Sequence, residues 1–439
     1  MTYGNQHKQL LKLAFPLILA NITTPLLGLV DTAILGHMGA SHFLAGASIG
    51  SLIITQLYWI CGFLKMSMTG ISAQSYSQAP HIKLQRLITG MYFALSVSVI
   101  ILVFQTLFIN AGLWFLSSSP EAIESASNYF NVRIWGAPAA LVNMVLIGWL
   151  IGQQKTIHVF IWQLTINILN IIISLFLVYG LDMGVSGVAA GTLIAEYAGL
   201  VIGVSICLSR ISILKLNWSM PEYSSVKAFF SLNLHILSRN LVLQATLAFV
   251  SLVGATYGVE AAAINALMLQ FFALIALGLD GIANAVEAMV GNAKGKKARK
   301  ELLGAVNVGI VWSSIFAVMY SVIFFVAENT LAQLFTDQQD IINAFKDYGL
   351  ILVLLPLISH MCFLFDGVYI GLTEAKVMRN TMFISTVFGF LPIYYLLKAS
   401  FGNEALWFAM LSFLAWRGVL LCGHFYYKRR NVEQSTLLE

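Results

Sequence analysis

Asp31 is a carboxylate inside an apolar run, within the segment Gly28-Leu-Val-Asp-Thr-Ala-Ile-Leu-Gly36. A carboxylate at membrane depth costs roughly 2.5–3.5 kcal/mol on insertion scales, so such a residue is a candidate functional site. A carboxylate that gains and loses a proton can bias a change in helix packing. We therefore predict that Asp31 takes part in ion coupling. A structural carboxylate held by neighbouring helices is the alternative.

A second set of polar residues lies at helical spacing in two other apolar runs. Counted from the ends of these runs, several lie within about one helical turn of the depth of Asp31. We predict that Asn170, Ser174, Thr192 and Glu196 form a proton- or ion-coupling cluster with Asp31. Candidates for the substrate pathway are Asn143, Gln163 and Asn167. Interhelical hydrogen bonding alone would also explain such a stripe.

The second half of the chain has its own candidate functional residues inside apolar runs. They are Asp280, Asn284, Glu287 and Asp366. These residues lie near predicted basic loops, so either a structural or gating ion pair or a coupling role fits them. Lys65 and Arg239 are possible partners for such pairs. Arg133 is near one end of its run, where an arginine can extend its head group towards water.

The elements that position these residues are apolar helices. Hydrophobic residues make up 59% of the 439 residues, charged residues make up 10%, and the mean hydropathy is +0.83. This composition predicts an all-α polytopic membrane protein, and the basic residues in membrane-flanking loops do not indicate nucleic-acid binding. The expected spans are 9–36, 44–76, 84–109, 125–152, 157–180, 184–209, 228–256, 260–292, 302–326, 343–371, 377–398 and 403–427. No metal-binding spacing of cysteines occurs, and we expect neither a metal nor a cofactor.

The two halves of the chain are related by a repeat. Glycines of the first half recur 219 residues later, as in Gly62 and Gly281 or Gly148 and Gly367. An even number of spans in each half predicts two parallel six-helix lobes related by a pseudo-two-fold axis along the membrane normal. We place the lobes at 1–209 and 228–439, joined by a cytoplasmic linker at 210–227.

The loops predict the orientation of the chain. Those on the side of both termini carry most of the lysine and arginine, whereas the opposite side carries Lys346 and Lys398. The excess of positive charge predicts cytoplasmic termini. The small-residue pairs Gly148/Gly152 and Gly367/Gly371 predict close helix packing.

Several motifs together resemble the MATE (multidrug and toxic compound extrusion) family. They are Gly28-Leu-Val-Asp-Thr-Ala-Ile-Leu-Gly-His-Met-Gly39, Gly148-Trp-Leu-Ile-Gly152 and Gly184-Val-Ser-Gly-Val-Ala-Ala-Gly-Thr192. Asp280-Gly-Ile-Ala-Asn-Ala-Val-Glu287 and Asp366-Gly-Val-Tyr-Ile-Gly371 are similar to its DinF (DNA-damage-inducible protein F) branch. The resemblance covers essentially the whole chain. It implies two six-helix lobes that export cationic and amphipathic drugs with a proton or sodium gradient.

The resemblance also assigns roles to residues. It implies a coupling site at Asp31, Asn170 and Thr192, a bend of the first helix at Pro16, and a coupling position of other branches at Asp366. Pro25 is a second hinge candidate. One position departs from the pattern, because Ser174 stands where the family usually has a second aspartate. Sodium sites favour several hard oxygens and negative charge, whereas a proton needs a single shielded carboxylate.

We therefore predict a proton-coupled multidrug antiporter, and not an enzyme, acting as a monomer in the bacterial inner membrane. Its expected partners are small-molecule drugs, protons and membrane lipids. Two alternatives remain open, a sodium-coupled antiporter of the same family and a lipid-intermediate flippase of the same superfamily. The flippase would favour a cavity lined with arginine and lysine that binds pyrophosphate.

Overall fold

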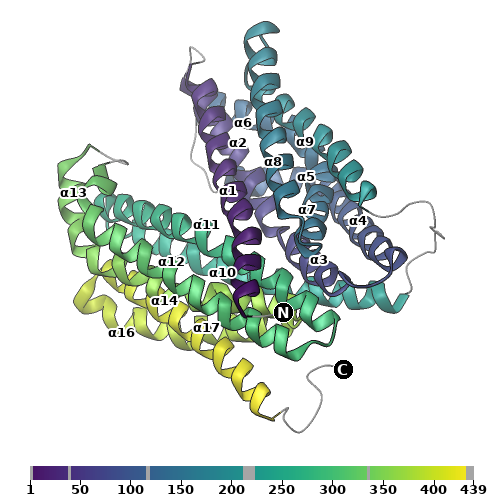
Figure 1. Cartoon of the computed structure of the whole chain (residues 1–439). Helices are drawn as coiled ribbons and strands as arrows, with labels where there is room; N and C mark the ends of the chain where they lie inside the picture. Colours follow the sequence, from purple (N-terminus) through teal and green to yellow (C-terminus); the bar gives the residue numbers. More distant parts are fainter. Residues whose placement is uncertain (1–2, 38–40, 115–118, 211–222, 334–336, 432–439) are drawn as a thin grey trace. The chain divides into compact units, whose positions relative to one another are not determined.

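The computed structural model describes residues 3–37, 41–114, 119–210, 223–333 and 337–431. Every regular element in these ranges is a helix, and twelve stretches are long and apolar enough to cross a membrane (Figure 1). The predicted class and number of spans are confirmed. The longest helices are α1 (Tyr3–Gly36), α4 (Pro80–Val103), α9 (Gly184–Ser209), α10 (Tyr223–Ala255), α11 (Val259–Gly295), α12 (Arg299–Gln333), α14 (Gly349–Gly371) and α17 (Glu404–Asn431).

Several spans consist of two helical segments separated by a short irregularity. α2 (Ser41–Ile60) and α3 (Phe63–Gln74) meet at Cys61 and Gly62. α6 (Pro120–Arg133) and α7 (Ala137–Gly152) are separated by one tight turn at Ile134–Gly136. Pro138 explains this second break, because proline has no N–H to donate to the preceding turn and its ring disfavours a continuous helix. The break places Arg133 at the last position of α6.

A wide π turn occurs in the fifth span of each half, at the end of the span in the first half and within it in the second. α8 (Thr156–Leu175) ends in such a turn at Phe176–Gly180, whereas Ser385–Phe390 separates α15 (Ala375–Ile384) from α16 (Leu391–Phe401). Two shorter helices complete the set of elements named here, α5 (Gln105–Trp114) and α13 (Gln339–Phe345).

The 219-residue repeat of the glycines also appears in the positions at which the helices begin. α4 begins at Pro80 and α12 at Arg299, while α6 and α13 begin at Pro120 and Gln339, each pair 219 residues apart. α8 and α15 follow the same spacing. The two halves of the chain therefore form the same succession of helices, as the internal repeat predicts.

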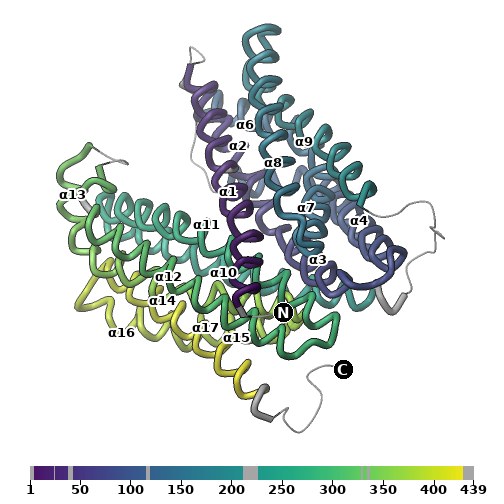
Figure 2. Tube along the Cα trace, in the orientation of Figure 1, coloured from purple at the N-terminus to yellow at the C-terminus, as the bar shows by residue number. Residues whose placement is uncertain are grey.

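Contacts divide the chain into two units, which we call the N-unit (Leu19–Phe230) and the C-unit (Met1–Ile18 with Ser231–Glu439). The division falls inside α1 and inside α10, not in a loop. Figure 2 shows the trace of α1 continuing as one helix through this point. The lobe boundaries predicted along the sequence differ from this grouping at the first 18 residues and at residues 228–230, and they stay a prediction. Most of the predicted linker, residues 211–222, lies outside the described residues.

The side-chain contacts made by the first turns of α1 and α10 explain why the division between the two units falls inside these helices. In the C-unit, the side-chain amide of Gln6 donates to the Glu301 carbonyl at 3.0 Å, and the Trp312 indole donates to His7 Nδ1 at 3.1 Å. In the N-unit, the ring of Phe93 lies 5.4 Å from that of Phe229. The start of α1 therefore packs in the C-unit, which the second half of the chain builds. The start of α10 packs in the N-unit, which the first half builds.

Small residues let helices approach closely inside each unit. A Cβ at Gly148 or Gly152 of α7 would overlap backbone atoms of α3, and one at Gly367 or Gly371 of α14 would overlap backbone atoms of α11. The predicted packing role of these glycine pairs is confirmed. Inside a membrane no hydrophobic effect drives helices together, so small residues that allow close van der Waals packing stabilise their association.

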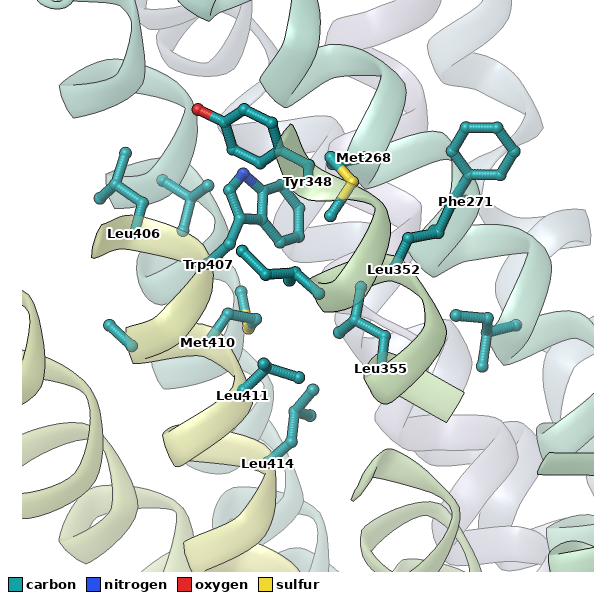
Figure 3. Close-up of a cluster of buried hydrophobic side chains, with 14 of the residues drawn as sticks. Met268, Phe271, Tyr348, Leu352, Leu355, Leu406, Trp407, Met410, Leu411 and Leu414 are labelled. Carbon is teal, nitrogen blue, oxygen red and sulfur yellow. The ribbon is translucent and has the colours of Figure 1, made fainter. Parts of the chain in front are cut away.

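The C-unit has a large apolar core between α11, α14 and α17. Figure 3 shows Trp407, Met410 and Leu414 of α17 facing Leu352 and Leu355 of α14. A buried polar network lies at one end of this core. Its members are Asn265, Tyr348, Asn403 and Trp407, joined by hydrogen bonds of 2.7–3.1 Å. This network fixes three helix starts relative to one another, because each buried polar group needs its partner.

Candidate functional site

Asp31 lies on the last part of α1, five residues before the helix ends at Gly36. Its side chain is half-buried, and its Oδ1 atom is buried without a hydrogen-bond donor among the described residues. Ile34 and Leu35, one turn further on, pack with Tyr129 of α6 and Val188 of α9. This apolar cluster holds the end of α1 against the helices that carry the other polar groups.

An ion pair between Arg133 and Glu196 connects α6 to α9. The guanidinium donates to both carboxylate oxygens, with Nη1···Oε2 at 2.7 Å and Nη2···Oε1 at 2.5 Å. The two side chains are 8% and 16% exposed. Planar two-point pairing of this kind is the strongest arrangement available to an arginine and a carboxylate.

The local sequence makes room for this pair. A Cβ at Gly136 would lie 2.5 Å from both Arg133 Nη1 and Glu196 Oε2, so any larger residue there would displace the pair. Asn143 of α7 donates from Nδ2 to the Glu196 backbone carbonyl at 3.0 Å, which fixes the same turn of α9. The break after α6 and the glycine within it therefore build a buried arginine site.

Two tyrosines complete the surroundings of Arg133. Its Cζ lies 5.4 Å from the ring centre of Tyr58, a distance at which the ring face attracts the cation. The charge of Asp31 acts on Tyr129 and interacts with that of Arg133. One cation and two carboxylates, Asp31 and Glu196, therefore share one electrostatic environment inside the N-unit.

The remaining predicted coupling residues form separate, local bonds. Ser174 donates to Asn170 Oδ1 at 3.3 Å, and both residues are buried. A Cβ at Gly191 of α9 would overlap the Ser174 hydroxyl, so α8 and α9 touch at this point. Thr192 donates to the Val188 carbonyl of its own helix at 3.1 Å. In the ranges that the structure describes, none of these three hydroxyl and amide groups bonds to Asp31.

The candidates for the substrate pathway have distinct contacts. Asn167 donates from Nδ2 to the Thr23 carbonyl at 3.3 Å, which joins α8 to α1 within the N-unit. Gln163 is half-buried on the same helix. Both hinge candidates lie within α1, where Pro16 is buried and Pro25 is exposed.

The carboxylates of the C-unit have different surroundings from one another. Asp366 of α14 is buried and pairs with Arg239 of α10 and with Arg417 of α17, the latter at 2.5 Å. Arg239 also donates to Asn240 Oδ1 at 3.0 Å. The charge of Asp280, an exposed residue of α11, acts on Arg417. Of the two partners suggested from the sequence, Arg239 is the one that pairs with Asp366.

The other candidates of this half lie along α11. Asn284 is half-buried, and Glu287 is buried next to the close approach of α11 and α14 at Gly371. Lys65, the second suggested partner, belongs to the N-unit. No group of three or more His, Cys, Asp or Glu side chains within the described ranges could hold a metal ion.

Two arginines were missed or misread from the sequence. The expectation that Arg133 extends towards water is wrong, because the side chain is buried and pairs with Glu196. The pairing of Arg417 with Asp366 does not follow from the spacing of residues along the sequence. A signal was available in both cases, since an arginine within an apolar span needs a carboxylate on another helix at a similar depth.

Comparisons with known proteins agree on one family. The MatE family profile matches residues 16–176 and 236–395. DNA damage-inducible protein F of Escherichia coli is 35% identical over 418 residues, which cover 94% of this chain and 91% of that protein. The multidrug resistance protein NorM of Aliivibrio fischeri is 23% identical over 98% of this chain and 96% of its own length.

A solved structure shows the same fold. The crystal structure of a mutant of the Vibrio cholerae MATE transporter VcmN matches with a TM-score of 0.85 at 18% identity, over 98% of both chains. The profile match, the DinF relative and the shared fold confirm the resemblance inferred from the motifs. The chain is a multi-pass membrane protein of the MATE transporter family, most similar in sequence among these relatives to DNA damage-inducible protein F.

Proposed function

We propose that this protein exports amphipathic and cationic organic compounds in exchange for protons, by alternating access, with Asp31 as the proton carrier. The observation that supports the proposal is the lack of a hydrogen-bond donor at one oxygen of the Asp31 carboxylate in the described part of the chain. Asp31 Oδ1 is buried without a donor in the described part of the chain, whereas Glu196 and Asp366 are each bound by arginine. A carboxylate without such a partner is the one whose charge a proton can most readily remove.

The multidrug part of the proposal rests on relatives. NorM of Aliivibrio fischeri is named a multidrug resistance protein, and the chain matches it over nearly its whole length. The energy supplied by one proton is sufficient. A membrane potential of ~100 mV contributes about 2.3 kcal/mol and one pH unit about 1.4 kcal/mol, which together support roughly a 500-fold gradient of a neutral substrate.

Sodium coupling is the second candidate within the family. Sodium needs several oxygen ligands, and the position usually taken by a second carboxylate holds Ser174, whose hydroxyl bonds to Asn170. The shortage of negative charge at this position favours the proton. A flippase that binds pyrophosphate would need unpaired arginines, whereas Arg133 and Arg417 both bind carboxylates.

Efflux from proteoliposomes tests the proposal, with a pH gradient and a sodium gradient imposed separately and the membrane potential clamped. We expect efflux with the pH gradient alone. Efflux driven by sodium at equal pH would contradict proton coupling, and no efflux under either gradient would contradict secondary transport. Proteolysis of oriented vesicles tests the further proposal that both termini lie in the cytoplasm of a bacterial cell.

A further inference from the structure

The feature that the proposed function leaves unexplained is the ion pair beside the proton carrier. Arg133 and Glu196 occupy the interior of the N-unit, bonded at two points, with Gly136 shaped to fit them. If the pair only fastened α6 to α9, apolar side chains would do so without the desolvation of two charges. The charge of Arg133 also acts on Asp31, which gives the pair a second consequence.

We infer that Arg133 is a positioning residue that cancels the charge of Glu196, so that Asp31 is the carboxylate of this cluster whose charge the transported proton balances. The inference rests on the proposed proton coupling. With both carboxylates ionised, two negative charges and one positive charge leave the cluster at −1. One proton brings the cluster to zero, and the geometry of the pair decides which carboxylate receives it.

The geometry assigns the proton to Asp31. Glu196 uses both oxygens to accept from Arg133, and the carbonyl of the same residue accepts from Asn143. Asp31 Oδ1 accepts no hydrogen bond from any described residue. A carboxylate with two charge-assisted bonds is held in its ionised form, whereas one without them is more readily neutralised.

The other titratable groups that interact with the cluster are two tyrosines and a cysteine. Those that interact with Arg133, Asp31 or each other are Tyr58, Tyr129 and, beside Tyr58, Cys61. The side chains of tyrosine and cysteine both ordinarily ionise above neutral pH. The polar residues that α8 supplies, Asn170 and Ser174, carry no charge. The charge balance of the cluster therefore depends on Arg133, Glu196 and Asp31.

This balance predicts opposite effects for the two halves of the pair. Glu196→Gln leaves Arg133 free to stabilise the ionised form of Asp31, so the pH of half-maximal efflux shifts to lower pH by roughly one unit or more. Arg133→Gln removes the cation that interacts with Asp31 and favours its ionised form, so the profile shifts to higher pH. The double variant Arg133→Gln/Glu196→Gln removes both charges, and its profile returns close to that of the original protein.

The experiment measures proton-driven efflux against pH in proteoliposomes for these three variants, after size-exclusion chromatography has established that each is folded. Glu374→Gln is the matched control, because it makes the same chemical change in the ion pair of Glu374 with Lys428, 2.8 Å long and partly exposed. We expect its profile to be unchanged.

The outcomes separate this inference from the proposed function. Opposite shifts that cancel in the double variant support the inference. If efflux by the unaltered protein follows the pH gradient while both single variants lose rate at an unshifted pH, the pair is structural and the inference is wrong. If efflux by the unaltered protein ignores the pH gradient, the proposed function fails and this inference fails with it.

Discussion

Replacing Asp366 by asparagine should destabilise the C-unit strongly. The carboxylate binds two arginines, Arg239 and Arg417, and the three residues are 7%, 7% and 3% exposed. Removing one partner from a buried ion pair costs about 3–5 kcal/mol, because the remaining charge is left without compensation. Asp280 still acts on Arg417 after the change. We therefore expect a loss near the lower end, about 3 kcal/mol.

The assay is denaturant-induced unfolding in detergent, followed by tryptophan fluorescence, to which the buried Trp407 of the C-unit contributes. Asp31→Asn is the matched control, since it makes the same change of atoms at a half-buried carboxylate whose Oδ1 accepts no described hydrogen bond. The control should change the free energy of unfolding by less than about 1 kcal/mol. A loss of the same small size for Asp366→Asn would refute the reasoning that the two arginines depend on this carboxylate.

Three further predictions concern transport. Asp31→Asn should abolish drug efflux with expression near that of the unaltered protein, and undiminished drug resistance in cells expressing it would reject Asp31 as the carrier. Ser174→Asp should raise the sensitivity of efflux to sodium by adding a ligand charge, where the site accommodates the larger side chain, and a sodium response measured at zero pH difference checks this. Pro16→Ala should slow efflux while substrate affinity in detergent is unchanged, because a missing backbone hydrogen bond weakens α1 there. Equal losses of affinity and rate would instead indicate a misfolded unit.

The sequence predicts the helices well because the relevant signals are local and repeated. Apolar length sets the twelve spans, and the 219-residue repeat sets helix starts such as Pro120 and Gln339. The breaks inside spans were not predicted. An apolar run continues through Ile134–Gly136 without a change of composition, although Pro138 interrupts the hydrogen bonding.

The site was harder to predict because its central contact joins different helices. Helical spacing brings Asn170 and Ser174 onto one face of α8, and their side chains bond to each other. No spacing within one helix relates Arg133 to Glu196, which are 63 residues apart in the chain. Such a pair follows only from asking which partner each buried charge requires.

The starts of α1 and α10 have a consequence for how the protein can be divided. Residues 3–18 of α1 pack in the unit that the second half of the chain builds, and the Phe229 end of α10 packs in the unit that the first half builds. The halves thus exchange arms reciprocally, as protomers do in a domain-swapped dimer. Fragments 1–210 and 223–439 expressed alone would each lack a helical segment that the other carries, and each should fold stably only when the two are made together.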